Sequence, residues 1–488
     1  MKKSVLFLLI ILLPVLIHGQ NNEFNCFSVL AGKDATASGA VMAGHNEDDH
    51  GKNIINLLTV DKKSAEATKT HMTRQGEKIR VKGKNKHGFL WIEMPGQDFA
   101  GSYVNDNGVV IFSNACPSKE DRPELTNGGI GFMFRRVLAE NAGSAREALE
   151  IAGRLIEKYG YDSSGRTYTI ADKKEAWVLA VVNGKHWVAQ RVPDNEVVVI
   201  PNYYTITEVR LEDSKNFMGS KGIIEYAVKR GWYDPEKDGK FNFRKAYGKP
   251  GSLAHPGNIA RKWQGLKMIT GKSFPMEKPF PFSVKPQKKL TAGRLMQIMG
   301  DHYEGTEFDA SNGYQYGNPH DNPVHTICAG HNQYSMVVEL KKDIPKEMGV
   351  LMWIAFRRPC TQPFLPIFTG LDKFPSSTRL HNPETALKKH LSPEETLKVN
   401  GKHFFTDYIK FSAFTDNHYT EVIDKIREYK KERQRKLFQG VEDTEATFQK
   451  MYRKSPEKAK AELVRFTNEL LKGNRKFMHS MMEKHGEN

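Results

Sequence analysis

The chain has 488 residues, of which 39% are hydrophobic and 10% are aromatic, so it can bury a large core and does not have a disordered composition. Its 73 Lys and Arg against 57 Asp and Glu give a net charge of +16. These basic residues are interleaved with acidic ones, and no aromatic-basic module or RNA-binding signature accompanies them. We therefore expect a solvated basic surface and no nucleic-acid partner.

The chain begins with a pattern typical of a secretory signal peptide. Lys2 and Lys3 precede an apolar run from Val5 to Ile17, and Gly19 offers a small residue for cleavage. The run is too short for a membrane span, and no later run approaches the ~18 apolar residues that a span needs. We expect residues 1–19 to be removed and the mature protein to be periplasmic or secreted, without stable membrane insertion.

Short apolar runs bounded by turn residues predict many strands and few helices in the body of the chain. The expected strands are Cys26–Leu30, Ala40–Ala43, Ile54–Val60, Phe89–Met94, Val109–Ser113, Tyr168–Ala171, Ala176–Val182, Trp187–Val192, Val197–Ile200, Val324–Cys328, Tyr334–Leu340 and Gly349–Phe356. Helices are expected over Phe132–Glu140 and over Ala145–Lys158, where Ser144 is the N-cap. Several strands follow one another directly, which favours an α+β fold of layered antiparallel sheets with helices outside.

Two later regions differ in character from this body. Residues 233–286 are rich in Lys, Gly and Pro and predict an irregular excursion with short helices. From residue 417 the pattern is charged and helical, with helices expected over 421–438 and 456–484. We therefore separate a catalytic domain, residues 26–416, from a basic C-terminal helical extension, residues 417–488.

The chain contains four cysteines, at positions 26, 116, 328 and 360. Because an oxidising compartment permits disulfides, the sequence is consistent both with a Cys328–Cys360 disulfide and with buried free thiols. There is no CxxC motif, so the spacing predicts no zinc site.

Cys26 opens a predicted strand just after the signal region. The preceding Asn25 is not the small residue that a signal peptidase prefers, and the sequence before Cys26 is a poor lipoprotein box. Self-cleavage by the thiol, with loss of residues 20–25 as a short propeptide, is the economical way to expose Cys26. The new α-amine, with a pKa of about 7.7–8.0, would then accept the thiol proton without a histidine partner. The alternative is an ordinary buried cysteine.

Motifs along the chain occur in an order that resembles one family of hydrolases. Cys26 is followed by Gly32-Lys33-Asp34-Ala35, Ser38-Gly39 and His45-Asn46-Glu47-Asp48. Further motifs follow in the middle and near the end: Ala171-Asp172-Lys173-Lys174-Glu175-Ala176-Trp177, His186-Trp187-Val188-Ala189, Arg191-Val192-Pro193-Asp194, Asn202, Thr326-Ile327-Cys328, His331 and Gly349-Val350-Leu351-Met352-Trp353. Over residues 26–410 the chain resembles the dipeptidase A and secernin family of N-terminal-nucleophile cysteine hydrolases.

This resemblance implies a four-layer αββα sandwich of two antiparallel sheets and an exported cysteine dipeptidase that acts on small peptides without a cofactor. It implies Cys26 as nucleophile, Asp48 as the carboxylate that orients the amine and thiol, Asn114 as an oxyanion donor on a strand neighbouring that of Cys26, and Asn202 as a further polar group at the amine. His45 and Asn46 are expected to contact substrate. The bile-salt hydrolase relatives have Arg where this chain has His45, which changes how a substrate carboxylate is held.

Other functions fit the same residues. A related enzyme could cleave or transfer the acyl group of a non-peptide amide, and a non-catalytic binding protein could use the same fold. A third alternative is a metal-dependent hydrolase whose ligands are His45, Asp48, Asp49 and His50. The sequence leaves the oligomeric state and the preferred peptides open.

Overall fold

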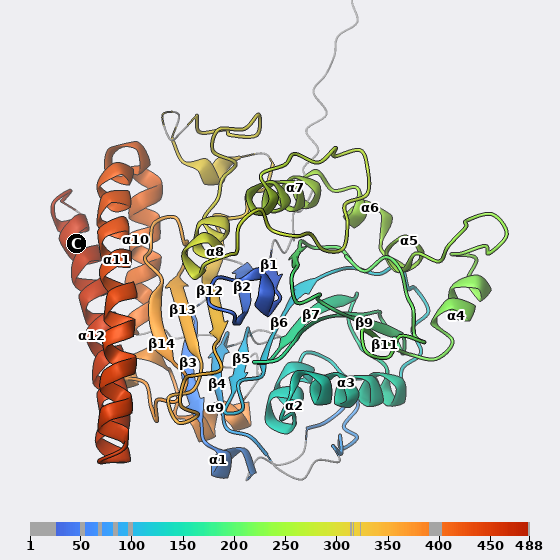
Figure 1. Cartoon of the computed structure of the whole chain (residues 1–488), viewed down its shortest axis with the longest axis horizontal. Coiled ribbons are helices and arrows are strands. Elements are labelled where there is room, and N and C mark those ends of the chain that lie inside the picture. The colour runs from blue at the N-terminus through green and yellow to red at the C-terminus, as the bar shows by residue number, and fades with distance from the viewer. Residues whose placement is uncertain are drawn as a thin grey trace, which may run out of the picture.

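The protein is described from a computed structural model that covers residues 26–48, 54–66, 71–81, 86–95, 101–312, 315, 317–322, 324–389 and 403–486. Two antiparallel sheets form its centre (Figure 1). The predicted signal peptide and propeptide lie outside the described residues, as do Asp49 and His50.

The first sheet has six strands in the order β10-β1-β2-β12-β13-β14. The bounds are β1 Phe27–Ala31, β2 Val41–Asp48, β10 Val197–Ile200, β12 Asn332–Leu340, β13 Leu351–Phe356 and β14 Leu365–Phe368. β1 lies between β10 and β2, and its register places Phe27 opposite Asn46 and Ser28 opposite His45. The N-terminal strand is therefore in the interior of the sheet, and every residue of β1 and β2 is buried.

The second sheet has eight strands in the order β11-β9-β8-β7-β6-β5-β4-β3. The bounds are β3 Asn56–Val60, β4 Phe89–Glu93, β5 Tyr103–Asn105, β6 Val110–Ala115, β7 Arg166–Ala171, β8 Ala176–Val181, β9 Trp187–Arg191 and β11 Phe217–Gly219. It is an up-and-down arrangement in which almost every strand pairs with its neighbour in sequence.

Helices cover the outer face of each sheet (Figure 1). α2 (Phe134–Asn141) and α3 (Ala145–Tyr159) pack on the eight-stranded sheet, and α7 (Pro256–Thr270) and α8 (Ala292–Met299) pack on the six-stranded sheet. One apolar core fills the space between the sheets and reaches α7 and α8, and a second lies between the eight-stranded sheet and α2–α3. The predicted α+β class and αββα layering are confirmed.

Local signals explain several boundaries, and two expectations were wrong. Ser144 caps α3 by accepting a hydrogen bond from the Glu147 amide at 3.2 Å, as predicted. Residues 324–328 do not form a strand, because Ile327 and Cys328 are buried by loop packing rather than by sheet pairing. The excursion over 233–286 contains the 15-residue α7, not only short helices.

The remaining helical segments are shorter or lie at the C-terminus. They are α1 Lys62–Glu66, α4 Ile223–Lys229, α5 Phe243–Tyr247, α6 Pro250–Leu253, α9 Pro383–Lys389, α10 Phe404–Asn417, α11 Tyr419–Tyr452, α12 Pro456–Glu483 and the 3₁₀ turns η1 Lys33–Ala35, η2 Pro319–Asp321 and η3 Ser376–Thr378. α10, α11 and α12 pack together beside β14 (Figure 1). On α12, Leu463 and Leu470 are buried and Phe466 between them is partly buried, so this apolar face packs against the body of the protein. Across the described residues, no helix is both long enough and apolar enough to span a membrane.

Candidate active site

Cys26 lies immediately before β1, between the two sheets, and is 2% exposed. Its Sγ lies 3.5 Å from Oε1 of Glu47 and 3.6 Å from the carbonyl oxygen of Asp48, both on the adjacent strand β2. Burial raises the pKa of the thiol well above its ordinary value, and the charges of Glu47 and Asp48 raise it further. While residue 25 is attached, the thiol is therefore protonated and shielded from solvent.

Glu47 stays ionised beside this thiol. Burial alone would raise the pKa of its carboxyl group, but the hydrogen bond and charge of His45, together with Arg135 and Arg166, lower it overall. Nε2 of His45 lies 3.1 Å from Oε2 of Glu47, and the ring stacks on Phe112 of the facing sheet. His45 and Glu47 are two residues apart on β2 and so point to the same side of the sheet. That side faces the interior between the two sheets.

Asn114 joins this interior cluster from β6 of the eight-stranded sheet. The Ser28 hydroxyl donates to Oδ1 of Asn114 at 2.6 Å and also contacts Nδ1 of His45 at 2.9 Å. Because a hydroxyl has one hydrogen, Nδ1 of His45 must donate to Ser28. Nδ2 of Asn114 donates one hydrogen to the carbonyl of Ile200 at 3.1 Å, so its second hydrogen is available to a ligand.

The prediction that Asn114 lies on a strand next to that of Cys26 was wrong. β1 pairs with β10 and β2, so Asn114 approaches from the opposite sheet rather than from the next strand. Ser28 and Cys26 are two residues apart and point to the same side of the chain, which brings the Asn114 amide to the Cys26 side of the interior.

Asn202 is linked to Cys26 through Arg261, which the sequence pattern did not predict as a site residue. Arg261 on α7 donates to the Cys26 carbonyl at 3.3 Å and to Oδ1 of Asn202 at 3.0 Å. It also donates to Oδ1 of Asn258 at 2.7 Å, and Nδ2 of Asn202 donates to the Ala115 carbonyl at 2.9 Å. Arg261 is 1% exposed, so these contacts fix a buried charge against Cys26, the residue before β1.

Asn46 and Asp48 point to the other face of β2. Nδ2 of Asn46 donates to the carbonyls of Met299 and Ile327, at 2.9 and 2.8 Å, and so ties the strand to the loop that follows α8. The charge of Asp48 interacts with the buried guanidinium of Arg357, whose pKa is lowered to about 9 by burial and by the neighbouring Arg358. Asp48 is fully buried.

Comparison with known families shows the class of the protein. The model of peptidase family C69 matches residues 118–432, which is more than half of the chain. The chain belongs to peptidase family C69. It is therefore a peptidase.

Curated relatives and a solved structure are similar to parts of this chain. A probable dipeptidase from Latilactobacillus sakei is 25% identical over 363 residues, which cover 71% of this chain and 74% of the relative. A dipeptidase from Bifidobacterium longum (strain NCC 2705) is 25% identical over 390 residues, covering 72% of each. A penicillin V acylase structure from Agrobacterium tumefaciens covers 70% of this chain and 86% of its own, with 11% identity and a TM-score of 0.35.

Two residues of the site were not predicted, Glu47 and Arg261. Glu47 stands inside the His45–Asp48 motif, and strand alternation alone would have paired it with His45 on the interior face. Arg261 lies in a region expected to be irregular, and only the tertiary packing of α7 brings its guanidinium to Cys26. The alternative metal cluster cannot be assembled from the described residues, since Asp49 and His50 lie outside them.

Proposed function

We propose that this C69 peptidase is a dipeptidase whose nucleophile is Cys26, acting as the first residue of the mature chain. The observation that carries the proposal is the position of Cys26 at the start of β1, inside the sandwich, with Arg261 on its carbonyl and Glu47 at its thiol. The dipeptidase names of the relatives support the substrate class.

Exposure of the α-amine would reverse the electrostatics of the thiol. In the unprocessed chain the thiol faces two carboxylates, which oppose its ionisation. A terminal amine on the same residue supplies a base of about the right pKa, and once protonated it supplies a positive charge beside the thiolate. Asp48 is proposed to hold that amine, with Asn202 as a further polar group near it.

The chemical step is acyl transfer through a thioester. The thiolate attacks the carbonyl carbon, the carbon–nitrogen bond breaks and the leaving amine takes a proton, and water then hydrolyses the thioester. The free hydrogen of the Asn114 amide is proposed to stabilise the oxyanion, and His45 is proposed to position substrate. The expected substrate contact of Asn46 does not fit, because its side chain points to the other face of β2 and donates to the carbonyls of Met299 and Ile327. Each oxyanion donor contributes about 2.7–4 kcal/mol to the transition state.

Self-processing uses the same thiol. The Cys26 thiol would attack the Asn25 carbonyl, form a thioester with Asn25 and release its own amine, after which water cleaves the thioester. Glu47 Oε1, 3.5 Å from Sγ, is placed to accept the thiol proton in this step. Cys26→Ala should then retain residues 20–25; a Cys26→Ala chain that still begins at residue 26 would point to an external protease.

Export is the remaining part of the proposal. The basic start, the apolar run and Gly19 support a signal peptide over residues 1–19. Fractionation of cells that express the full chain should place the protein in the periplasm or medium, with a mass that lacks these residues. A full-length chain in the cytoplasm would contradict this part alone.

A substrate panel tests the proposed activity. The processed enzyme should release both amino acids from unblocked dipeptides, and should cleave tetrapeptides and N-acyl amides at least about tenfold more slowly in kcat/KM. Preference for N-acyl amides over every dipeptide would instead indicate a related amidase on this fold.

A further inference from the structure

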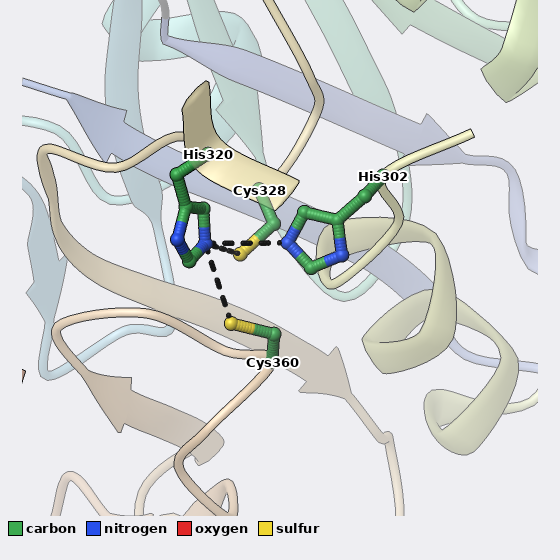
Figure 2. Close-up of side chains that lie close together, drawn as sticks. All are labelled: His302, His320, Cys328 and Cys360. Atoms are coloured by element: carbon green, nitrogen blue, oxygen red, sulfur yellow. Dashed lines mark hydrogen bonds between the residues drawn. The ribbon is translucent and has the colours of Figure 1, made fainter. Parts of the chain in front are cut away.

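Two histidines and two cysteines meet on the loop side of the six-stranded sheet, away from the nucleophile. His302 follows α8, His320 lies in η2, Cys328 precedes β12 and Cys360 follows β13. One ligand atom of each residue lies within 4.8 Å of the ligand atoms of the other three, and Figure 2 shows the four side chains pointing toward a common centre.

The distances match a tetrahedral metal site. Nε2 of His302 lies 3.3 Å from Nε2 of His320, which lies 3.5 Å from Sγ of Cys360 and 3.8 Å from Sγ of Cys328. Zinc bonds of about 2.0–2.1 Å to nitrogen and 2.3 Å to sulfur, at tetrahedral angles, require separations of about 3.3 Å between nitrogens and about 3.6 Å between nitrogen and sulfur.

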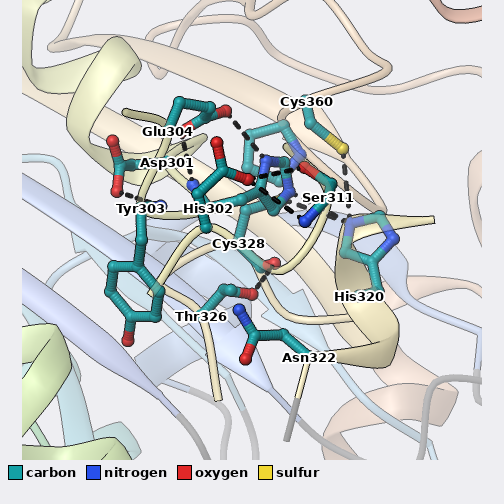
Figure 3. A network of polar contacts seen from close by, with 12 residues as sticks. Asp301, His302, Tyr303, Glu304, Ser311, His320, Asn322, Thr326, Cys328 and Cys360 are labelled. Atoms are coloured by element: carbon teal, nitrogen blue, oxygen red, sulfur yellow. Dashed lines mark hydrogen bonds and ion pairs between the residues drawn. The ribbon is translucent and has the colours of Figure 1, made fainter. Parts of the chain in front are cut away.

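The imidazole ring of His302 has a carboxylate on the nitrogen that faces away from the centre, whereas the nearest carboxylate to His320 lies beyond hydrogen-bond distance. Nδ1 of His302 lies 3.1 Å from Oε1 of Glu304, and Nδ1 of His320 lies 4.0 Å from Oδ1 of Asp416 (Figure 3 shows the Glu304 side). A carboxylate behind a histidine orients the ring and strengthens it as a metal ligand. Nε2 of His302 is thereby directed to the centre.

The cluster is enclosed but has an access route. The side chains of His302 and His320 are 0% and 3% exposed, and Cys328 is 0% exposed. Cys360 is 7% exposed and lines a groove of about 780 Å³ between α8 and α11. Metal can enter through this groove, and the burial of the four ligands leaves little room for water as an additional one.

We propose that His302, His320, Cys328 and Cys360 bind one Zn²⁺ in a structural site. Two thiolates and two neutral imidazoles form a common structural zinc set, and four protein ligands fill the tetrahedral shell, so no open position is left for catalysis. Tetrahedral S₂N₂ coordination favours zinc over magnesium, calcium or manganese, which take oxygen ligands.

The metal would fix the loop after α8 to the turn after β13. Cys360 lies two residues after Arg358, whose guanidinium pairs with Asp416 on α10, so the site would also brace the C-terminal helices. On the other side, Asn46 holds the carbonyls of Met299 and Ile327, which flank His302 and Cys328 along the chain. Through these contacts the metal would set the position of the loop beside the candidate active site without touching the reacting atoms.

Metal analysis of the untagged protein, purified without chelator and without a metal-affinity column, tests the proposal. Elemental analysis should find about one zinc per chain in the wild type and in Cys116→Ser, which removes a buried cysteine outside the cluster. Cys328→Ser/Cys360→Ser should hold less than about a tenth as much. The wild type with chelator should lose its zinc and melt at a lower temperature, and zinc should restore both.

Cobalt replacement makes the test independent of whether the double variant folds. Co²⁺ added to the metal-free wild type should give the intense visible bands of a tetrahedral ion and the near-ultraviolet bands of thiolate ligands. A wild type that contains no zinc and develops no such bands would overturn the proposal. A Cys328–Cys360 disulfide in the protein isolated without oxidant, found by mass spectrometry of alkylated peptides, would also overturn it.

Discussion

The two cysteine clusters of this peptidase are opposites in construction. Cys26 immediately precedes a regular strand and faces carboxylates, and burial together with these charges raises the pKa of its thiol. Cys328 and Cys360 stand on loops and face imidazole nitrogens. On these proposals the same side chain would serve two purposes, and the groups that face each thiol would decide whether it suits attack on a carbonyl or metal binding.

The largest effect should follow from loss of the nucleophile. Cys26→Ala should lower the turnover of a dipeptide by about 10⁴-fold or more, because nothing replaces the attacking atom. Cys116→Ala, which also removes a buried thiol, should stay within about tenfold of the wild type. Initial rates on purified proteins of equal folded content measure both. A Cys26→Ala enzyme with near-normal turnover would remove Cys26 from the chemistry.

Removal of the side-chain amide of Asn114 should have the next largest effect. Asn114→Ala should lower kcat by about 100–1000-fold with a smaller change in KM, because an oxyanion donor acts mainly in the transition state. Asn216→Ala, at a surface turn, is the matched control. A rise in KM of about the same size, with kcat unchanged, would instead assign Asn114 to substrate binding.

The carboxylate behind His302 should tune the metal cluster and leave the nucleophile unchanged. Glu304→Gln should weaken zinc binding by about 10–100-fold, since it no longer orients the imidazole as a charged acceptor. Glu307→Gln, on the same loop but exposed, should bind zinc as the wild type does. Competition with a chelator of known affinity measures both, and identical affinities would rule out this role for Glu304.

The smallest effect concerns pH and Glu47. The pKa of the Glu47 carboxyl group in the folded protein is below its usual value of 4.5. The ionised carboxylate therefore contributes its full stabilisation above pH 4.5, and this stabilisation is lost as the pH falls through the pKa of the folded state. The free energy of unfolding of Glu47→Gln should therefore change less between pH 5 and pH 3 than that of the wild type. Denaturant titrations at each pH measure this, with Glu212→Gln as an exposed control. Parallel wild-type and Glu47→Gln curves would contradict the assigned ion pair.

The difference between the clusters also explains what the sequence could predict. Strand residues alternate, so most strands were predicted from local pattern, although the strand predicted over Ala40–Ala43 stopped short of His45–Asp48, which belong to β2. The layering of the sheets followed from the number of successive strands without helices between them.

The rest depended on contacts between distant segments. Ser28 and Asn114 are 86 positions apart and meet only because the two sheets face each other. Arg261 is brought to Cys26 by the packing of α7, and the metal cluster is assembled from positions 302 to 360 without any compact spacing. The absence of CxxC predicted no zinc site, but loops can bring such ligands together at any separation in the sequence.

Determining the first residue of the mature wild-type enzyme tests the central claim most directly. N-terminal sequencing, combined with the intact mass of an active preparation, should give a chain that begins at Cys26, with a free amine and a free thiol on that residue. An active enzyme that begins at residue 20, or at any other residue before Cys26, would contradict the account, because the α-amine of Cys26 would still be locked in a peptide bond.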